Sequence, residues 1–226
     1  MSGTRAKLLE AAAQAVCEDG VAAASARAIA ARAQVNQALV FYHFGTVSEL
    51  LEAASRRRVD DSVAHYRERF ASVRTLSELL AVGRDLHERE RAAGNVALMA
   101  QLMSGGQHDP VLARAARYAM GTWTAEVEAV VMRVLAGSPL ADVTNLAGLA
   151  PAITAGFIGL ELFEGVDPDA AASALNALER LGVLVEVVND LGPVGRSAMR
   201  AKMRTRRGLD QGDRTRNRSK DSGGER

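Results

Sequence analysis

The sequence predicts an all-α protein, and three observations support that prediction. Only five of the 226 residues are proline, and alanine, leucine and arginine predominate, so helix is favoured along most of the chain. Helix-capping signals recur along the sequence. Long runs in which valine, isoleucine and threonine alternate with polar residues, the pattern of strands, do not occur. With 48% hydrophobic residues, a chain of this length can bury a sizeable core.

Three short helices are expected within residues 1–45. Thr4 can cap the first, whose apolar residues recur at spacings of three and four until Gly20. Ser25 can cap a short second helix over "ARAIAARA", and Asn36 can cap a third that ends near residue 44. The short turn between the second and third helices is typical of a helix-turn-helix, so residues 1–45 are predicted to form a small three-helix bundle of that kind.

Six mostly longer helices are expected after residue 45, which gives about nine in all. Capping boxes begin two of them, at Thr46 with Glu49 and at Thr75 with Glu78. An apolar helix over residues 95–103 follows, and aspartate–proline pairs begin two more at residues 109–110 and 167–168. Another lies at about 141–164, and the last ends near residue 191. Because residues 46–74 are expected to form one continuous helix, a ligand bound to the helices after residue 45 could mechanically move the three helices before it.

The charges are distributed unevenly. Residues 196–226 contain 11 basic and 4 acidic residues, a net charge of +7, whereas residues 59–195 contain 10 and 18, a net charge of −8. Residues 1–58 are slightly basic. The two ends could therefore face a polyanion, which the middle would repel. Residues 196–226 are interpreted as a basic tail, disordered over 204–226 and at most a frayed helix over 196–203.

The single cysteine and the N-terminal sequence predict a cytoplasmic protein. Cys17 excludes an internal disulfide and a multi-cysteine metal site, and its apolar neighbours indicate a small buried side chain. Met1 leads directly into charged helical sequence without a signal peptide. The apolar stretch 146–160 is short for a membrane span and is interrupted by Pro151 and glycines, so no contact with a membrane is expected.

The segment "NQALVFYHF", residues 36–44, has an unusual distribution of side chains for a surface helix. Helical periodicity places Val40, Phe41 and Phe44 on one side, which is the expected core face. The other side carries Ala38, Leu39, Tyr42 and His43, with Gln37 in the first turn. Amides, a small apolar group, tyrosine and histidine suit a DNA major groove and its phosphates. The alternative is a helix packed on both sides, with Tyr42 and His43 at a domain contact.

The stretch "TRAKLLEAAAQAVCEDGVAAASARAIAARAQVNQALVFYHFGTVSELL" resembles the N-terminal DNA-binding domain of the TetR family of bacterial transcriptional regulators. The matching residues are Thr4–Arg5, Leu8–Leu9, Ala12, Gly20, Ser25, Arg27, Ile29–Ala30, Val35–Asn36, Val40, Tyr42–His43–Phe44 and Leu50. The resemblance implies that residues 46–195 form an effector-binding and dimerisation domain. The residues expected to contact DNA are Arg5, Ser25, Arg27, Asn36, Gln37, Ala38, Leu39, Tyr42, His43 and Thr46.

Two positions depart from the family pattern. Gln34 stands in the turn where the family usually has glycine, so either a non-glycine residue is left-handed there, at a cost on the order of 1 kcal/mol, or the turn differs. Val47 stands where the family often has a lysine that meets a phosphate. We expect the basic tail to offset part of that lost contact.

The later helices suggest a ligand pocket and a dimer interface. Methionine and aromatic residues from three helices are candidates to line an adaptable apolar pocket, although ordinary core packing would also explain each of them. These candidates are Met99, Met103, Met120, Trp123, Phe157 and Phe163. His87, His108, Glu161 and Glu164 are possible polar anchors there, but surface positions are expected for them. Small residues four apart in one helix and an apolar stripe along the last helix predict a twofold dimer, and packing within the protomer is the alternative. The residues expected at the dimer interface are Ala152, Ala155, Gly156, Gly159, Leu178, Leu181, Val185 and Val188.

These features together predict a ligand-responsive repressor. A homodimer would occlude a pseudo-palindromic double-stranded DNA operator until a small-molecule effector releases it. Motifs for phosphate binding, nucleophilic catalysis or metal ligation are absent, so no catalytic residue, metal or cofactor is expected. The alternatives are a helical DNA-binding protein without an effector, an activator, and a helical enzyme.

Overall fold

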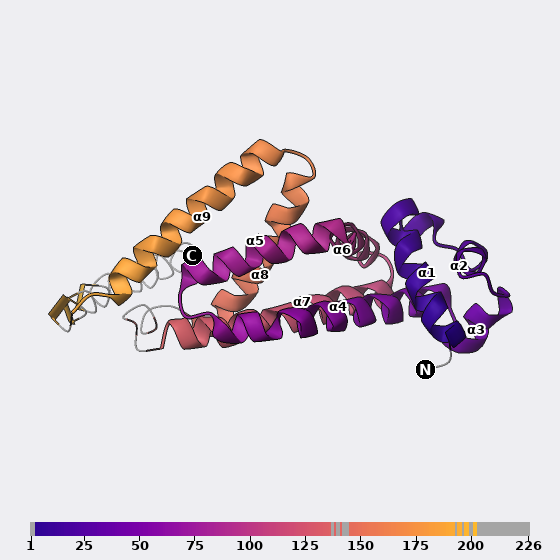
Figure 1. The fold of residues 1–226 in the computed structure, drawn as a ribbon, viewed down its shortest axis with the longest axis horizontal. Coiled ribbons are helices and arrows are strands. Elements are labelled where there is room, and N and C mark those ends of the chain that lie inside the picture. The colour runs from indigo at the N-terminus through magenta and orange to yellow at the C-terminus, as the bar shows by residue number, and fades with distance from the viewer. Residues whose placement is uncertain are drawn as a thin grey trace, which may run out of the picture.

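A computed structural model describes residues 3–136, 138, 141, 145–192, 194–195, 197–198 and 201–202. These described residues contain nine α-helices, one short 3-10 helix and no strand, which confirms the all-α prediction (Figure 1). The first helices are α1 (Gly3–Asp19), η1 (Val21–Ala23), α2 (Ala26–Arg32), α3 (Ala38–Phe44) and α4 (Val47–Ser72). They are followed by α5 (Leu76–Ala92), α6 (Asn95–Gly105), α7 (Pro110–Val134), α8 (Leu146–Glu164) and α9 (Pro168–Asn189). The predicted tail over 204–226 lies outside the described residues.

Side-chain caps begin five helices where the sequence places them, but Thr4 does not cap the first helix, because α1 already begins at Gly3. The hydroxyls of Ser25, Thr46 and Thr75 accept hydrogen bonds from backbone amides three residues later, at 3.1–3.2 Å. The carboxylates of Asp109 and Asp167 accept similar bonds from the first turns of α7 and α9. Each cap satisfies an amide that has no partner inside its helix. The eighth helix begins at Leu146 rather than near residue 141, and residues 142–144 of that predicted segment lie outside the described part of the chain.

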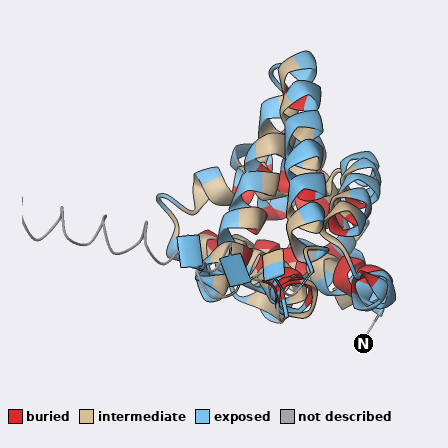
Figure 2. Ribbon diagram, turned by 90° about the vertical axis from the view of Figure 1, so that its left-hand side faces the viewer, coloured by how far each residue is buried: buried red, intermediate tan, exposed pale blue. Residues whose placement is uncertain are grey.

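Two clusters of buried side chains hold the helices together. The first joins α1, α2 and α3 to the start of α4, and Leu8, Ile29, Val40 and Leu50 are completely buried in it. It also contains residues of α6 and α7, so its packing continues beyond residue 45. The second joins α4, α5, α7 and α8 around Tyr66. Figure 2 shows buried residues on the inner sides of the helices and exposed ones on their outer faces.

Helix α4 belongs to both clusters, as the prediction of one continuous helix requires. Its first turns pack in the first cluster through Leu50 and Ala54, and its last turns pack in the second through Tyr66 and Phe70. It lies beside α7 along its length (Figure 1). Helix α4 therefore connects the larger bundle to the three N-terminal helices, which we call the head.

Candidate DNA interface and ligand cavity

The outer face of α3 is the candidate DNA interface. Tyr42 is 80% exposed, Gln37 and Ala38 are exposed, and His43 is half-exposed. The rings of Tyr42 and His43 meet edge to face, with centroids 5.0 Å apart. The side chains of Gln37, Tyr42 and His43 present hydrogen-bonding groups on this face. The helix is held from behind by Val40, so this face is available to a ligand such as a DNA groove.

One assignment in α3 is corrected by the structure. Phe41 was expected on the core face and Leu39 on the outer face, but Phe41 is 49% exposed and Leu39 packs partly against the first cluster. The two residues lie about 100° to either side of Val40, so the periodicity of the helix does not distinguish between them. The packing of α3 against α2 and α4 covers the side of Leu39. The outer face therefore consists of Gln37, Ala38, Phe41 and Tyr42, with the half-exposed His43 at its edge.

The turn between α2 and α3 contains a left-handed residue at Gln34, which was one of the two alternatives for this position. Gln34 has φ = 55°, the one positive φ outside glycine among the described residues. Its amide donates to Ala31 O and that of Val35 donates to Ala30 O, the two bonds of a Schellman motif. The first alternative for Gln34 is thus confirmed. Asn36 then starts α3, because its Oδ1 accepts from the Ala38 amide at 2.8 Å.

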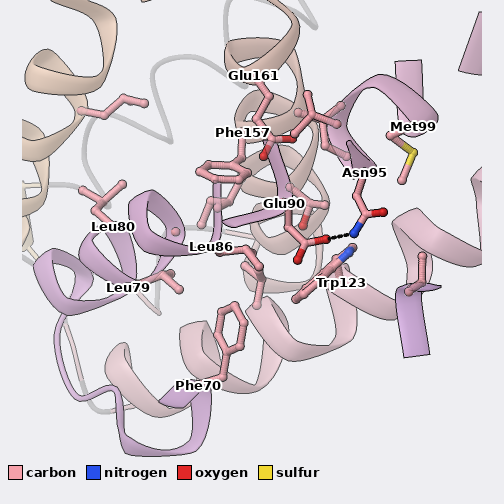
Figure 3. Close-up of a pocket in the computed structure, with 18 of the residues that line it drawn as sticks. Phe70, Leu79, Leu80, Leu86, Glu90, Asn95, Met99, Trp123, Phe157 and Glu161 are labelled. Carbon is pink, nitrogen blue, oxygen red and sulfur yellow. Dashed lines mark hydrogen bonds between the residues drawn. The ribbon is translucent and has the colours of Figure 1, made fainter. Parts of the chain in front are cut away.

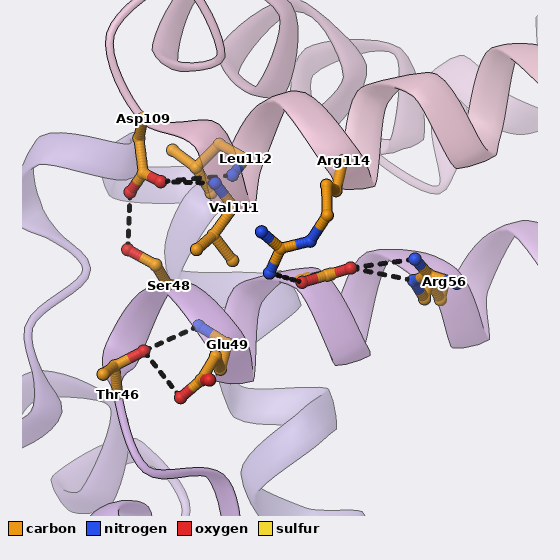
Figure 4. Close-up of polar contacts among 9 residues, drawn as sticks. Thr46, Ser48, Glu49, Arg56, Asp109, Val111, Leu112 and Arg114 are labelled. Carbon is orange, nitrogen blue, oxygen red and sulfur yellow. Dashed lines mark hydrogen bonds and ion pairs between the residues drawn. The ribbon is translucent and has the colours of Figure 1, made fainter.

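The remaining predicted DNA contacts lie around α3. Ser25 and Arg27 are exposed at the start of α2, and the Arg5 guanidinium lies 4.9 Å from the centre of the Phe44 ring. The Thr46 hydroxyl is already engaged with Glu49, since it accepts from the Glu49 amide and donates to the Glu49 carboxylate at 3.0 Å (Figure 4). Val47 packs partly against the first cluster. The start of α4 therefore presents an acidic side chain beside Thr46 rather than a basic one.

The larger bundle encloses a cavity of about 470 Å³ between α4, α5, α6, α7, α8 and α9. Met99, Trp123 and Phe157 line it as predicted, whereas Met103, Met120 and Phe163 are not among its lining residues. Phe163 is 45% exposed on the outside of α8. Leucine, valine and isoleucine make up most of the wall, and a pocket wall of this kind has the same composition as a core, so the sequence does not distinguish the two (Figure 3).

Four charged residues meet at one end of the cavity. His87 on α5 contacts two carboxylates of α8, with 3.1 Å between Nδ1 and Glu161 Oε1 and a closer contact between Nε2 and Glu164. Arg91 donates to Glu164 at 2.6 Å. Burial raises the pKa of the Glu161 carboxyl above its ordinary value, and the contact with His87 opposes that rise only in part. His87, Glu161 and Glu164 were expected mainly at the surface, but the packing of α5 on α8 partly buries them. His108, the fourth residue of that expectation, is exposed.

A series of hydrogen bonds joins the cavity wall to the head, and we call it the Arg58 bridge. Glu90 and Asn95 line the cavity, and Asn95 Nδ2 donates to Glu90 Oε2 at 2.7 Å. Arg58 Nη1 donates to Asn95 Oδ1 and Nη2 to Glu10 Oε1, both at 2.9 Å. Glu10 belongs to α1. Nearby, the Cys17 thiol of α1 donates to Gly94 O, and burial raises the pKa of that thiol.

A second connection joins α4 to α7 beside the head (Figure 4). Ser48 Oγ donates to Asp109 Oδ2 at 2.7 Å, so the carboxylate that caps α7 also holds the first turn of α4. This hydroxyl, with the two backbone amides, lowers the pKa of Asp109 below its ordinary value. Further along, Glu52 of α4 pairs with Arg114 of α7 at 3.0 Å. The head is therefore attached to the bundle through both α4 and α7.

The outer faces of α8 and α9 are apolar and exposed. Ala152, Ala155, Gly156 and Gly159 of α8 all face outward, and a Cβ added at either glycine would meet no other atom within 4 Å. On α9, Leu178, Leu181 and Val185 line the cavity and Val188 is half-buried. The most exposed large apolar residues of α9 are Leu181, Val183, Leu184 and Val187. Among the described helices, α8 alone is long and apolar enough to cross a membrane by length and composition.

Comparisons with known proteins agree with this geometry. Residues 8–54 match the model of the family described as bacterial regulatory proteins, tetR family. None of the curated protein sequences matches the chain. The fold is similar to that of a candidate TetR-family transcriptional regulator from a Rhodococcus species, with a TM-score of 0.67 and 22% identity over 80% of this chain and 99% of that one.

Two further solved structures have the same fold. A candidate transcriptional regulator from Streptomyces coelicolor A3(2) is 24% identical, with a TM-score of 0.62 over 79% of this chain and 98% of that one. The fatty acid degradation regulator FadR from Bacillus halodurans is 15% identical, with a TM-score of 0.62 over 80% and 95%. Residues 8–54 thus match the model of the TetR family of bacterial regulatory proteins, and the chain shares its fold with a TetR-family transcriptional regulator.

Proposed function

We propose that the protein is a cytoplasmic transcriptional repressor that binds a pseudo-palindromic DNA operator as a homodimer and is released by a small-molecule effector. One observation supports the regulatory part most directly. Leu98 and Leu102 of α6 line the cavity and also belong to the buried cluster of the head. A ligand that displaces these side chains therefore disturbs the packing that positions α1 and α4.

DNA recognition is assigned to the outer face of α3. Gln37 can pair with an adenine edge, Tyr42 can reach a phosphate, and Phe41 takes the apolar contact with a thymine methyl that the sequence suggested for Leu39. Arg27 and the amides at the start of α2 provide phosphate contacts. Asn36 contributes mainly by starting α3, since its Oδ1 is already bonded. The basic tail is expected to add non-specific affinity.

Coupling between effector and DNA follows from the contacts of α4 and α6. The Arg58 bridge joins the cavity wall to α1, and the leucines of α6 join it to the head cluster. A ligand shifts the DNA-binding equilibrium only by its differential affinity for the two arrangements, typically about 1–3 kcal/mol. An effector-free DNA-binding protein would not require a cavity of about 470 Å³ beside these contacts. The cavity therefore favours the ligand-responsive function.

Selection of bound DNA from a random library tests the DNA-binding part. The wild-type protein is expected to enrich a pseudo-palindromic sequence, Tyr42→Ala to weaken binding broadly, and Gln37→Ala to relax preference at particular bases. Met132→Ala is a matched control, because this exposed side chain lies at the end of α7 far from the head. Wild-type protein that selects no sequence would refute the proposal. If the effector raised the affinity of the protein for its operator, the result would argue against release by the effector and would be compatible with an activator.

The proposed dimer can be tested at the glycines of α8. Gly156→Leu has room within the protomer, so it is expected to leave the fold intact and to block close approach of a second α8. Gly121→Leu is the control, because Gly121 is exposed on α7 and equally unobstructed. Light scattering after size exclusion should give a dimer for wild type and the control, and a monomer for Gly156→Leu. A wild-type monomer at micromolar concentration would count against the dimer.

A further inference from the structure

The cavity has one hydrogen-bonding oxygen that the protein does not use. Glu161 lines the cavity, and its Oε1 contacts His87, but Oε2 has no hydrogen-bond partner among the described residues. The Glu161 side chain is only 12% exposed. A partly desolvated carboxylate oxygen in a mainly apolar cavity gains free energy from a donor, because it has lost part of its hydration. The ligand is expected to provide that donor.

The other carboxylate, amide and hydroxyl groups of the wall are already engaged in hydrogen bonds. Glu90 accepts from Ser62 Oγ at 2.6 Å and from Asn95 at 2.7 Å. Thr154 donates to Ala150 O at 3.0 Å, and Ser55 donates to Leu51 O at 2.8 Å. Hydrogen bonds with a ligand at these residues would require breaking bonds within the protein. Glu161 is therefore the polar anchor of the cavity.

The charges around the anchor favour a cation over an anion. Glu90 and Glu164 lie close enough to oppose ionisation of Glu161, so three carboxylates surround this end of the cavity. Two arginines lie near them, and both are engaged: Arg91 with Glu164, and Arg58 with Glu10, Asn95 and a backbone carbonyl. His87 is likewise engaged, with Glu161 and Glu164. An anionic headgroup would lose hydration and face these carboxylates. No group of three or more potential metal ligands suited to a metal ion occurs in the described part of the chain.

The rest of the cavity suits a long apolar body. Phe157 lies beside Glu161 at the same end, and Trp123 and Phe70 lie farther along the wall (Figure 3). An aromatic face next to a carboxylate also stabilises a bound cation. We propose that the effector is an elongated, mainly apolar molecule with one protonated amine, whose N–H donates to Glu161 Oε2. This inference rests on the proposed effector function and assigns its ligand class.

Binding of four ten-carbon probes, each below its micelle concentration, tests the ligand class. The probes are decylamine, decyltrimethylammonium, decanol and decanoic acid, which share a chain but differ in charge and N–H donor. The protein has a single tryptophan, and Trp123 lines the cavity, so its fluorescence reports occupancy. We expect decylamine to bind most tightly, decyltrimethylammonium more weakly because it lacks a donor, and decanoic acid most weakly.

The variant Glu161→Gln removes the charge at nearly constant volume. It is expected to lower decylamine affinity about 10- to 100-fold, the range for a hydrogen bond to a charged group, and to leave decanol affinity unchanged. Glu164→Gln is the matched control, because Glu164 contacts the same histidine but does not line the cavity. Circular dichroism checks that both variants fold.

Three results would overturn the ligand class: tighter binding of decanoic acid than of decylamine, no effect of Glu161→Gln on decylamine, or no binding of any probe. None of these would affect selection of an operator sequence by the ligand-free protein. Conversely, normal amine binding without sequence-selective DNA binding would refute the proposed function and leave the ligand class standing. The two proposals can therefore fail separately.

Discussion

Replacing Gln34 by glycine is expected to stabilise the protein. Gln34 is exposed in the turn between α2 and α3 with φ = 55°, a conformation that glycine adopts without a steric penalty. The two hydrogen bonds of the turn use only backbone atoms, so glycine retains them. No hydrogen bond of the Gln34 side chain with a described residue would be lost. The substitution therefore changes the backbone preference at one position and little else.

The magnitude follows from two opposing terms. A left-handed non-glycine residue costs roughly 1–2 kcal/mol, and relief of that cost stabilises the folded state. Glycine also increases the backbone entropy of the unfolded chain, which costs about 0.5–1 kcal/mol. The net gain is about 0.5–1 kcal/mol, which corresponds to a rise in Tm of about 1–4 °C for a chain of this size. The turn keeps its geometry, so operator affinity should not change.

Urea denaturation followed by circular dichroism measures the effect. Gln14→Gly is the matched control, because Gln14 lies inside α1, where glycine is expected to cost about 0.5–1 kcal/mol. The two glycine variants should thus differ from wild type in opposite directions. If Gln34→Gly destabilises the protein as Gln14→Gly does, the left-handed backbone at Gln34 is not strained and the reasoning is refuted.

Three other predictions concern stability, coupling and DNA affinity. Asp109→Ala should lower the free energy of unfolding by about 1 kcal/mol at pH 7. Because the folded-state pKa of Asp109 is lowered, its contribution is full above the unfolded pKa and is lost as the pH falls through the folded-state pKa. The difference between wild type and variant in urea titrations should therefore shrink as the pH is lowered below about 4. Glu10→Ala removes the acceptor of the Arg58 bridge outside the cavity. Decylamine should bind normally by fluorescence yet displace operator DNA about 3- to 10-fold less effectively, and an unchanged displacement would argue against the bridge. Val47→Lys should steepen the salt dependence of operator binding by about one phosphate contact in titrations at several salt concentrations; an unchanged slope would mean that position 47 lies away from the backbone.

Interactions between neighbouring residues could be predicted from the sequence. Each cap joins residues two or three positions apart, as at Ser25 and Ala28 or Asp109 and Val111, so residue spacing alone identifies it. Helix type and order followed from the same local signals. The resemblance of residues 4–51 to one family also located the outer face of α3 and drew attention to Gln34. These features depend on chemistry within one or two helical turns.

Contacts between distant residues were decided only by the tertiary structure. His87 and Glu161 are 74 residues apart, and only the packing of α5 on α8 makes them one charged end of a cavity. Leu39 and Phe41 flank Val40 equally, and the neighbours of α3 determine which one is covered. Helical periodicity fixes how residues are arranged around one axis, but it does not specify which other helix covers each side. The polar anchor of the cavity and the composition of the DNA-facing surface both depend on which helix covers each side, and only the tertiary structure determines this.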